Sequence, residues 1–439
     1  MIQKLKTIIG SFNTTIRSLQ LFQLFRFTGM LLIGILLAKL NVPLAQIGIY
    51  ESTLFLAGIC TFFWVSGLMN STLTVYPKKS EEDKKSFLFN IGIILVIFST
   101  ISAIAVWLYL FYSHQNIIED YSIKRAIVIY ILVNTPTFFN EYYFLLKEKK
   151  RSLIWYGIGS FTINVISVII PVIYTGEIIN SIYGLILFSA IKMLLFLFIL
   201  YKETIHRIDT AQILLFLKTA SPLIISILIS GSADYIDSWL VGTYFGKEQF
   251  AIFRYGAKEL PLSLILANSL STAMLPILSS GENIKQNFNK LIDESKLLMN
   301  WLFPLTIILL LGSKIIYPII FSEKFAESSA IFNIYLLLII SRMIFPQSIM
   351  LALNAQKEIF KTAVLEIIIN ISASYFLMLK FGVIGVAYGT LIAFLAEKII
   401  LAIILKSKNI GFQEYTPLRL WLGYSTLMVI VYLFVENFL

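Results

Sequence analysis

Thirteen ionisable side chains lie inside stretches of the sequence that are otherwise apolar. Two of them, Arg254 and Lys258, are four residues apart and would share one face of a helix. A guanidinium binds phosphate oxygens with a planar fork and an ammonium binds them as a point charge, so this pair suits a phosphate-like anion. A permanent ion-pair cluster is an equal alternative. The full set is Arg26, Glu51, Glu141, Lys192, Asp234, Asp237, Arg254, Lys258, Glu259, Arg342, Glu366, Glu397 and Lys398.

The carboxylates of this set suggest a second kind of chemistry. A carboxylate in apolar surroundings can exchange a proton, and with hydroxyl or amide neighbours it can bind a sodium ion. The candidates for such ion coupling are Asp237, Asp234, Glu51, Glu141 and Glu366. The alternative for each is a salt bridge to one of the cations. Asp237 stands out, because the expected topology places it at a depth similar to that of Arg254 and Lys258.

Residues for metal or nucleophilic chemistry are scarce. The chain has one cysteine, Cys60, and two histidines, His114 and His206, which lie in polar connectors. We therefore expect no disulfide, no zinc cluster and no cofactor.

The composition indicates what positions these side chains. Apolar residues make up 58% of the 439 residues and charged residues only 14%, against about 45–50% and about 25% in soluble domains. The chain has too few charges to cover a surface in water. This excludes a soluble enzyme or a nucleic-acid-binding domain as the main interpretation and predicts an all-α polytopic membrane protein. The net charge of +10 fits the excess of Lys and Arg on cytoplasmic loops.

Thirteen stretches are long enough to cross a bilayer as helices, which takes about 20 apolar residues each. With the N-terminus in the cytoplasm, 21 of the 35 Lys and Arg residues fall on inside connectors and 7 on outside connectors. This bias predicts a cytoplasmic N-terminus and an external C-terminus. The expected spans are 18–40, 45–75, 84–112, 122–146, 151–175, 179–202, 211–243, 249–280, 295–320, 327–354, 358–381, 383–405 and 417–437.

Two pieces of sequence recur at a shift of 205 residues. Tyr50 falls on Tyr255, and Tyr183-Gly184 falls on Tyr388-Gly389. Six expected helices separate the copies, so they have the same orientation. This predicts two parallel six-helix lobes, 1–207 and 208–407, with a central cavity, and an additional C-terminal helix in 408–439. Repeats of this kind bind substrate between the lobes and work by alternating access.

Several segments carry a resemblance to a known family. They are 237–246 (DSWLVGTYFG), 250–261 (FAIFRYGAKELP), 270–279 (LSTAMLPILS), 353–357 (LNAQK) and 380–390 (KFGVIGVAYGT). Together they resemble the polysaccharide-repeat-unit flippases, the O-antigen and capsule exporters of the multidrug/oligosaccharidyl-lipid/polysaccharide superfamily. The resemblance covers spans 1–12 and implies a fold like that of the MATE transporters.

The resemblance also implies an activity. It implies movement of an undecaprenyl-diphosphate-linked oligosaccharide across the bacterial cytoplasmic (inner) membrane, driven by a proton or sodium gradient, for surface polysaccharide synthesis. Arg26, Arg254, Lys258 and Arg342 would then bind the diphosphate. The implied partners are the lipid-linked oligosaccharide, membrane lipids, and the polymerase and glycosyltransferases of the same pathway, with no nucleic acid.

Three alternatives stay open. A multidrug or cation antiporter of the same superfamily would need a net acidic cavity, which the four cations disfavour. A flippase for a peptidoglycan-precursor lipid would use the same physics. A membrane enzyme, such as a polysaccharide polymerase or ligase, is disfavoured because no connector exceeds about twenty residues and none carries a catalytic loop.

Overall fold

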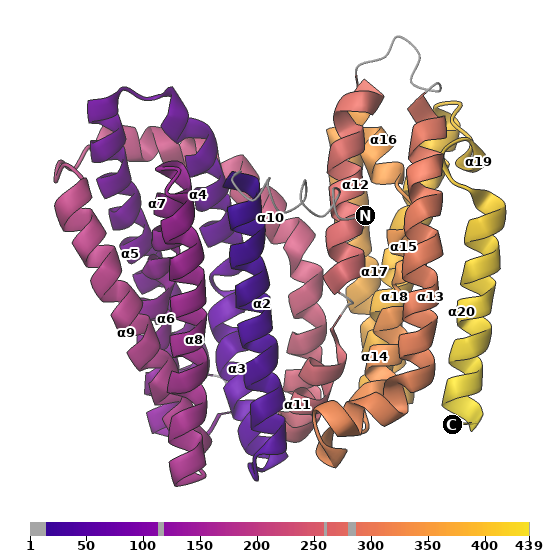
Figure 1. Ribbon diagram of the computed structural model, residues 1–439, viewed down its shortest axis with the longest axis horizontal. Helices are drawn as coiled ribbons and strands as arrows, with labels where there is room; N and C mark the ends of the chain where they lie inside the picture. Colours follow the sequence, from indigo (N-terminus) through magenta and orange to yellow (C-terminus); the bar gives the residue numbers. More distant parts are fainter. Residues whose placement is uncertain (1–14, 113–117, 259–260, 280–286, 439) are drawn as a thin grey trace, which may run out of the picture. The chain divides into compact units, whose positions relative to one another are not determined.

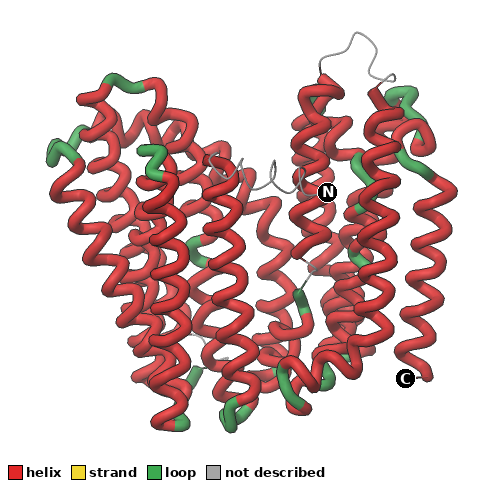
Figure 2. The backbone as a smooth tube through the Cα atoms, in the orientation of Figure 1, coloured by secondary structure: helices red, strands yellow, loops and turns green. Residues whose placement is uncertain are grey.

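In the computed structural model, residues 15–112, 118–258, 261–279 and 287–438 are described, and within these ranges the chain forms helices and turns without a strand (Figures 1 and 2). Nine of the described helices are long and apolar enough to cross a membrane, or up to eleven if each of two bent helix pairs counts as one span. The prediction of an all-α polytopic membrane protein is confirmed.

The chain divides into two compact units, Met1–Gly231 and Ser232–Leu439. The boundary lies inside a single long helix, α10 (Thr210–Tyr244), whereas the sequence places the lobe boundary at 207/208, in the connector before it. Unit 1 contains α2 (Thr15–Lys39), α3 (Leu44–Ile59), α4 (Phe62–Val75), α5 (Glu81–Tyr112), α6 (Tyr121–Asn134), α7 (Phe138–Leu146), α8 (Lys150–Thr175), α9 (Ile178–Glu203) and the first part of α10.

Unit 2 begins in the last part of α10 and contains ten further helices. These are α11 (Gly246–Gly256), α12 (Pro261–Ser279), α13 (Phe288–Ile320), α14 (Ser328–Leu336), α15 (Ile339–Arg342), α16 (Pro346–Ala352), α17 (Gln356–Phe381), α18 (Val383–Ser407), α19 (Phe412–Tyr415) and α20 (Leu418–Phe438).

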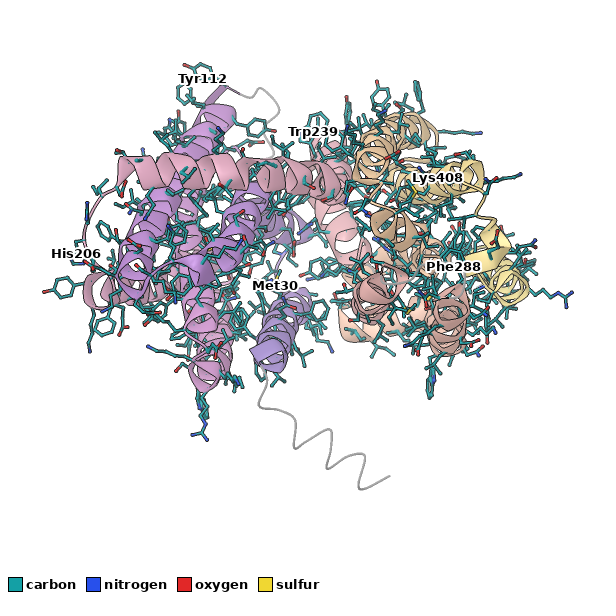
Figure 3. The ribbon with its side chains drawn as sticks, turned by 90° about the horizontal axis from the view of Figure 1, so that it is seen from above. Met30, Tyr112, His206, Trp239, Phe288 and Lys408 are labelled. Atoms are coloured by element: carbon teal, nitrogen blue, oxygen red, sulfur yellow. The ribbon has the colours of Figure 1, made fainter. Side chains whose placement is uncertain are left out.

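Many apolar side chains on these helices are exposed. Met30 on α2 and Trp239 on α10, both labelled in Figure 3, are 56% and 45% exposed. Exposed apolar residues are also found along α5, α8 and α9. Such a surface is stable where lipid tails replace water. Candidate functional groups are therefore the polar side chains inside each unit.

The repeat seen in the sequence reappears as a pair of matching helical hairpins. α9 begins at Ile178 and α18 at Val383, which are 205 positions apart. In the first hairpin, a Cβ at Gly184 would overlap the carbonyl oxygen of Ser167 on α8. In the second, a Cβ at Gly389 would overlap Ser374 on α17. The recurring glycine therefore allows the same close helix–helix approach in each unit.

Gly184→Ala is expected to destabilise unit 1 by about 1–3 kcal/mol, because the added methyl group must push α8 and α9 apart. The expected readout is a lower yield of monodisperse protein and a lower unfolding temperature in detergent. Gly159→Ala on α8 is the matched control, since a Cβ there meets nothing within 4 Å. Equal behaviour of the two variants would contradict the close-packing role.

Four of the thirteen expected spans are not single helices. Span 45–75 is α3 plus α4, bent by 48°, and span 327–354 contains α14–α15 and α16, bent by 41°. Span 122–146 is broken by a 3-10 turn at Thr135–Thr137 that contains Pro136. Span 249–280 is divided between α11 and α12. Because proline lacks an N–H and its ring clashes with the preceding turn, Pro136 and Pro346 account for two of these breaks.

The break between α3 and α4 is held by side-chain hydrogen bonds. Trp64 Nε1 donates to the carbonyl oxygen of Cys60 at 2.8 Å and to Ser102 Oγ at 3.0 Å, and Ser102 Oγ donates to the same carbonyl at 3.1 Å. The carbonyl freed by the bend is therefore satisfied within unit 1.

The additional C-terminal helix, α20, is part of unit 2. Trp421 Nε1 donates to the carbonyl oxygen of Ile340 at 2.9 Å, and Tyr424 Oη donates to Asn300 Oδ1 at 3.0 Å. Lys314 Nζ on α13 donates to the carbonyl oxygen of Val435 at 2.9 Å. α20 is thus tied to α13 and to the broken segment α14–α15, and it is 21 residues long.

Candidate functional site

Two of the predicted site residues meet in unit 1. Arg26 lies near the middle of α2 and Glu141 lies on the short helix α7. Arg26 Nη1 is 3.8 Å from Glu141 Oε2, with side-chain exposures of 42% and 14%. Sequence analysis assigned Arg26 to substrate binding and Glu141 to ion coupling, and the structure places them in one cluster.

A second cation, Lys192, belongs to the same cluster. It lies near the middle of α9, and its Nζ donates to Asn134 Oδ1 at 2.7 Å. Asn140 Nδ2, next to Glu141 in the chain, donates to the carbonyl oxygen of Lys192 at 3.0 Å. Arg26 and Lys192 thus both lie close to α7, the helix that carries Glu141. We call Arg26, Glu141 and Lys192 the unit 1 charge cluster.

The break between α6 and α7 positions the carboxylate of Glu141 and the side-chain amide of Asn134. Asn134 ends α6 and Glu141 lies in the first turn of α7, with the proline-containing turn between them. Thr137 Oγ1 donates to the carbonyl oxygen of Asn134 at 2.6 Å, and Ser99 Oγ donates to that of Leu132, which Pro136 leaves without its helical donor, at 3.3 Å. Hydroxyl groups thus satisfy carbonyls that the broken helix cannot pair.

A buried carboxylate forms the centre of the polar network in unit 2. Asp237 on α10 is 2% exposed. Its Oδ2 accepts hydrogen bonds from Tyr335 Oη on α14, at 2.9 Å, and from Thr390 Oγ1 on α18. Asn370 Nδ2 on α17 donates to Thr390 Oγ1 at 3.3 Å. Four helices therefore contribute to this network.

Arg254 and Lys258 do not share a helical face, which corrects the sequence prediction. α11 ends at Gly256, so Arg254 lies in its last turn and Lys258 lies beyond it. Glycine is a poor helix former, so Gly256 accounts for the end of the helix. Arg254 Nη1 donates at 3.5 Å to Oγ of Ser238, the residue that directly follows Asp237 in the chain. Lys258 Nζ lies 4.7 Å from the centre of the Tyr255 ring.

Arg342 ends α15, at the bend of the α14–α16 segment. Its guanidinium carbon lies 4.4 Å from the centre of the Phe394 ring on α18. One turn further along α18, Lys398 Nζ pairs with Glu397 Oε2 at 2.7 Å, and both side chains are largely buried. Glu397 is 205 positions from Lys192, so each unit places an ionisable group at this point of its hairpin.

The other predicted carboxylates are more dispersed. Glu51 on α3 is 8% exposed and Glu366 on α17 is half-buried. The side chain of Asp234 and all of Glu259 lie outside the described residues. Across the described ranges, no three His, Cys, Asp or Glu side chains come together as a metal site would require.

The two clusters differ in chemistry. Two cations and one carboxylate in unit 1 suit a phosphate-bearing anion. A carboxylate bonded by two hydroxyl groups in unit 2 suits a small cation. Sequence reasoning missed Tyr335 and Thr390. Thr390 directly follows Tyr388-Gly389, half of the sequence repeat, and this position was the available signal.

Comparison with protein families gives one match to most of the chain. The family described as "Lipid II flippase MurJ" matches residues 146–438. Among curated proteins, a putative O-antigen transporter of Shigella flexneri is 27% identical over 183 residues, which are 40% of this chain and 43% of that protein. The chain thus matches less than half the length of this relative.

Solved structures agree with the fold. "Lipid II flippase MurJ, inward closed conformation" has a TM-score of 0.68 at 19% identity, covering 95% of this chain and 93% of that one. A MATE transporter from Vibrio cholerae has a TM-score of 0.54 at 14% identity, covering 90% and 98%. At these identities the likeness shows a shared fold and nothing about substrates.

Proposed function

The chain belongs to the family of the lipid II flippase MurJ, and we propose that it moves an undecaprenyl-diphosphate-linked oligosaccharide across the bacterial cytoplasmic membrane. The oligosaccharide would be the repeat unit of a surface polysaccharide such as O-antigen or capsule. The chain would pass it from the cytoplasmic to the outer leaflet by alternating access, with its own N-terminus in the cytoplasm. The polymerase and glycosyltransferases of that pathway are the proposed partners.

The unit 1 charge cluster is the observation that carries this proposal. Charges near the middle of membrane helices are costly, and they persist where they contact a polar substrate or each other. The cluster holds two cations and one carboxylate, which leaves one positive charge in excess. A lipid diphosphate carries about two negative charges, whereas the cationic substrate of a multidrug antiporter would be repelled. Arg254, Lys258 and Arg342 are the further proposed contacts to the diphosphate in unit 2.

The family match itself favours a second candidate, a peptidoglycan-precursor lipid. That substrate also carries a diphosphate on a polyprenyl chain, so the charge cluster serves both equally. The likeness to the putative O-antigen transporter and the motifs at 237–246 and 380–390 favour the oligosaccharide.

We propose that the Asp237 network binds the coupling ion. Its carboxylate and the hydroxyl oxygens of Tyr335 and Thr390 are hard ligands of the kind that sodium takes, and the carboxylate alone can take up a proton. In this scheme the ion moves inward, opposite to the lipid, and its gradient drives the return of the carrier after the lipid has left.

A flipping assay in proteoliposomes tests the proposal. Wild type is expected to move a fluorescent undecaprenyl-diphosphate oligosaccharide between leaflets at least as fast as a fluorescent peptidoglycan precursor. Arg254→Ala/Lys258→Ala is expected to slow this flipping about tenfold, because two phosphate contacts are lost.

Lys406→Ala/Lys408→Ala, at the exposed end of α18, is the matched control and should flip at the wild-type rate. Faster movement of the peptidoglycan precursor would select the second candidate. Efflux of small organic cations without lipid flipping would overturn both.

A further inference from the structure

The contact between Arg26 and Glu141 is loose for an ion pair. Charge-assisted hydrogen bonds are typically about 2.7–2.9 Å long, whereas these atoms are 3.8 Å apart. Arg26 is also 42% exposed, although Glu141 is only 14% exposed. A guanidinium has five N–H donors in a fork that matches phosphate. The accessible partner of the pair is therefore the cation.

Lys192 is held in place from two sides. Its ammonium donates to Asn134 at 2.7 Å and lies 4.6 Å from the centre of the Phe188 ring. The hydrogen bond from Asn140 to its backbone carbonyl fixes α9 against α7, beside Glu141. An ammonium has three N–H donors, and Asn134 takes one. The side chain is thus held by Asn134 and Phe188, on a helix that is fixed against the helix carrying Glu141.

We propose that Glu141 is an internal counter-anion that occupies the phosphate position between Arg26 and Lys192 and is displaced when the lipid diphosphate binds. This inference rests on the proposed function and assigns two residues within its site. Lys192 becomes a substrate-binding cation, and Glu141 becomes a competitor that sets the affinity.

The charge balance explains what such a competitor achieves. With Glu141 in place, the empty cluster carries one excess positive charge instead of two, so its burial costs less. A diphosphate brings two negative charges and more acceptor oxygens than one carboxylate. It therefore outcompetes Glu141 on entry, and Glu141 replaces it on release. Without this carboxylate the substrate would bind more tightly and leave more slowly.

Binding of undecaprenyl diphosphate to the full chain in nanodiscs tests this, with undecaprenol as the uncharged lipid. Glu141→Gln is expected to lower the Kd for undecaprenyl diphosphate about tenfold, and Lys192→Gln to raise it about tenfold. Binding of undecaprenol should not change. If Glu141 has only a structural role, Glu141→Gln should bind undecaprenyl diphosphate more weakly than wild type or equally well.

Glu397→Gln is the matched control, because Glu397 is also a largely buried carboxylate paired with a lysine. Its Kd should stay within about twofold of wild type. If Glu141→Gln fails to fold, a second comparison tests the inference. The double variant Arg26→Gln/Glu141→Gln should bind undecaprenyl diphosphate more tightly than Arg26→Gln alone. No gain there would overturn the inference. Absence of diphosphate binding by wild type would instead overturn the proposed function.

Discussion

Asp237→Asn is expected to abolish the part of lipid flipping that depends on an ion gradient. The substitution keeps the size of the side chain and one hydrogen-bond acceptor for Tyr335 or Thr390, but removes the negative charge. Removing one partner of a buried charge pair costs about 3 kcal/mol of binding free energy. The coupling cation should therefore bind about a hundredfold more weakly. The measurement is the flipping rate with and without an imposed sodium or proton gradient, together with binding of radioactive sodium.

Two control variants test whether the loss of gradient dependence is specific to the Asp237 charge. Thr390→Ser keeps the hydroxyl that donates to Asp237 and should retain gradient dependence. Asp293→Asn removes a carboxylate that is 73% exposed and pairs with Lys296 on α13, and it should behave as wild type. Wild-type gradient stimulation in Asp237→Asn would show that the coupling ion binds elsewhere, with Glu51 and Glu366 as the next carboxylates to change.

The composition and the lengths of the apolar runs were sufficient to predict the fold class, since only helices can satisfy the backbone of such runs in lipid. The repeat was also visible, because Gly184 and Gly389 have the same packing task in each unit. Which of the expected spans are broken into separate helices was not predicted. Pro136 and Pro346 lie inside long apolar runs, and hydropathy alone does not distinguish a kinked span from two short helices.

The sequence singled out individual ionisable residues but not the way in which the fold groups them. Arg26, Glu141 and Asp237 were recognisable as ionisable residues in apolar stretches. Their partners come from distant segments: Tyr335 is 98 positions from Asp237, and Thr390 is 153 positions away. Only the fold brings them together. The i, i+4 argument for Arg254 and Lys258 failed because it assumes an unbroken helix, and α11 ends between them.

Arg26→Gln is expected to lower the flipping rate about a hundredfold, equivalent to about 3 kcal/mol. It removes the accessible cation of the unit 1 charge cluster and leaves the excess charge near zero, so little remains to attract a diphosphate. Arg26→Lys keeps the charge but loses the planar fork, and it should recover only part of the rate. The measurement is initial flipping rate in proteoliposomes at matched protein density, with undecaprenyl diphosphate affinity measured in parallel.

The comparison between the three side chains at position 26 separates charge from geometry. Equal rates for Arg26→Lys and wild type would mean that charge alone matters. Equal rates for Arg26→Gln and wild type would place the diphosphate elsewhere, among Arg254, Lys258 and Arg342. Lys84→Gln is the control, since Lys84 pairs with the highly exposed Glu81 at the beginning of α5. Lys84→Gln and Arg26→Gln each remove one positive charge. A loss of flipping seen only in Arg26→Gln must therefore come from the place of Arg26 in the cluster.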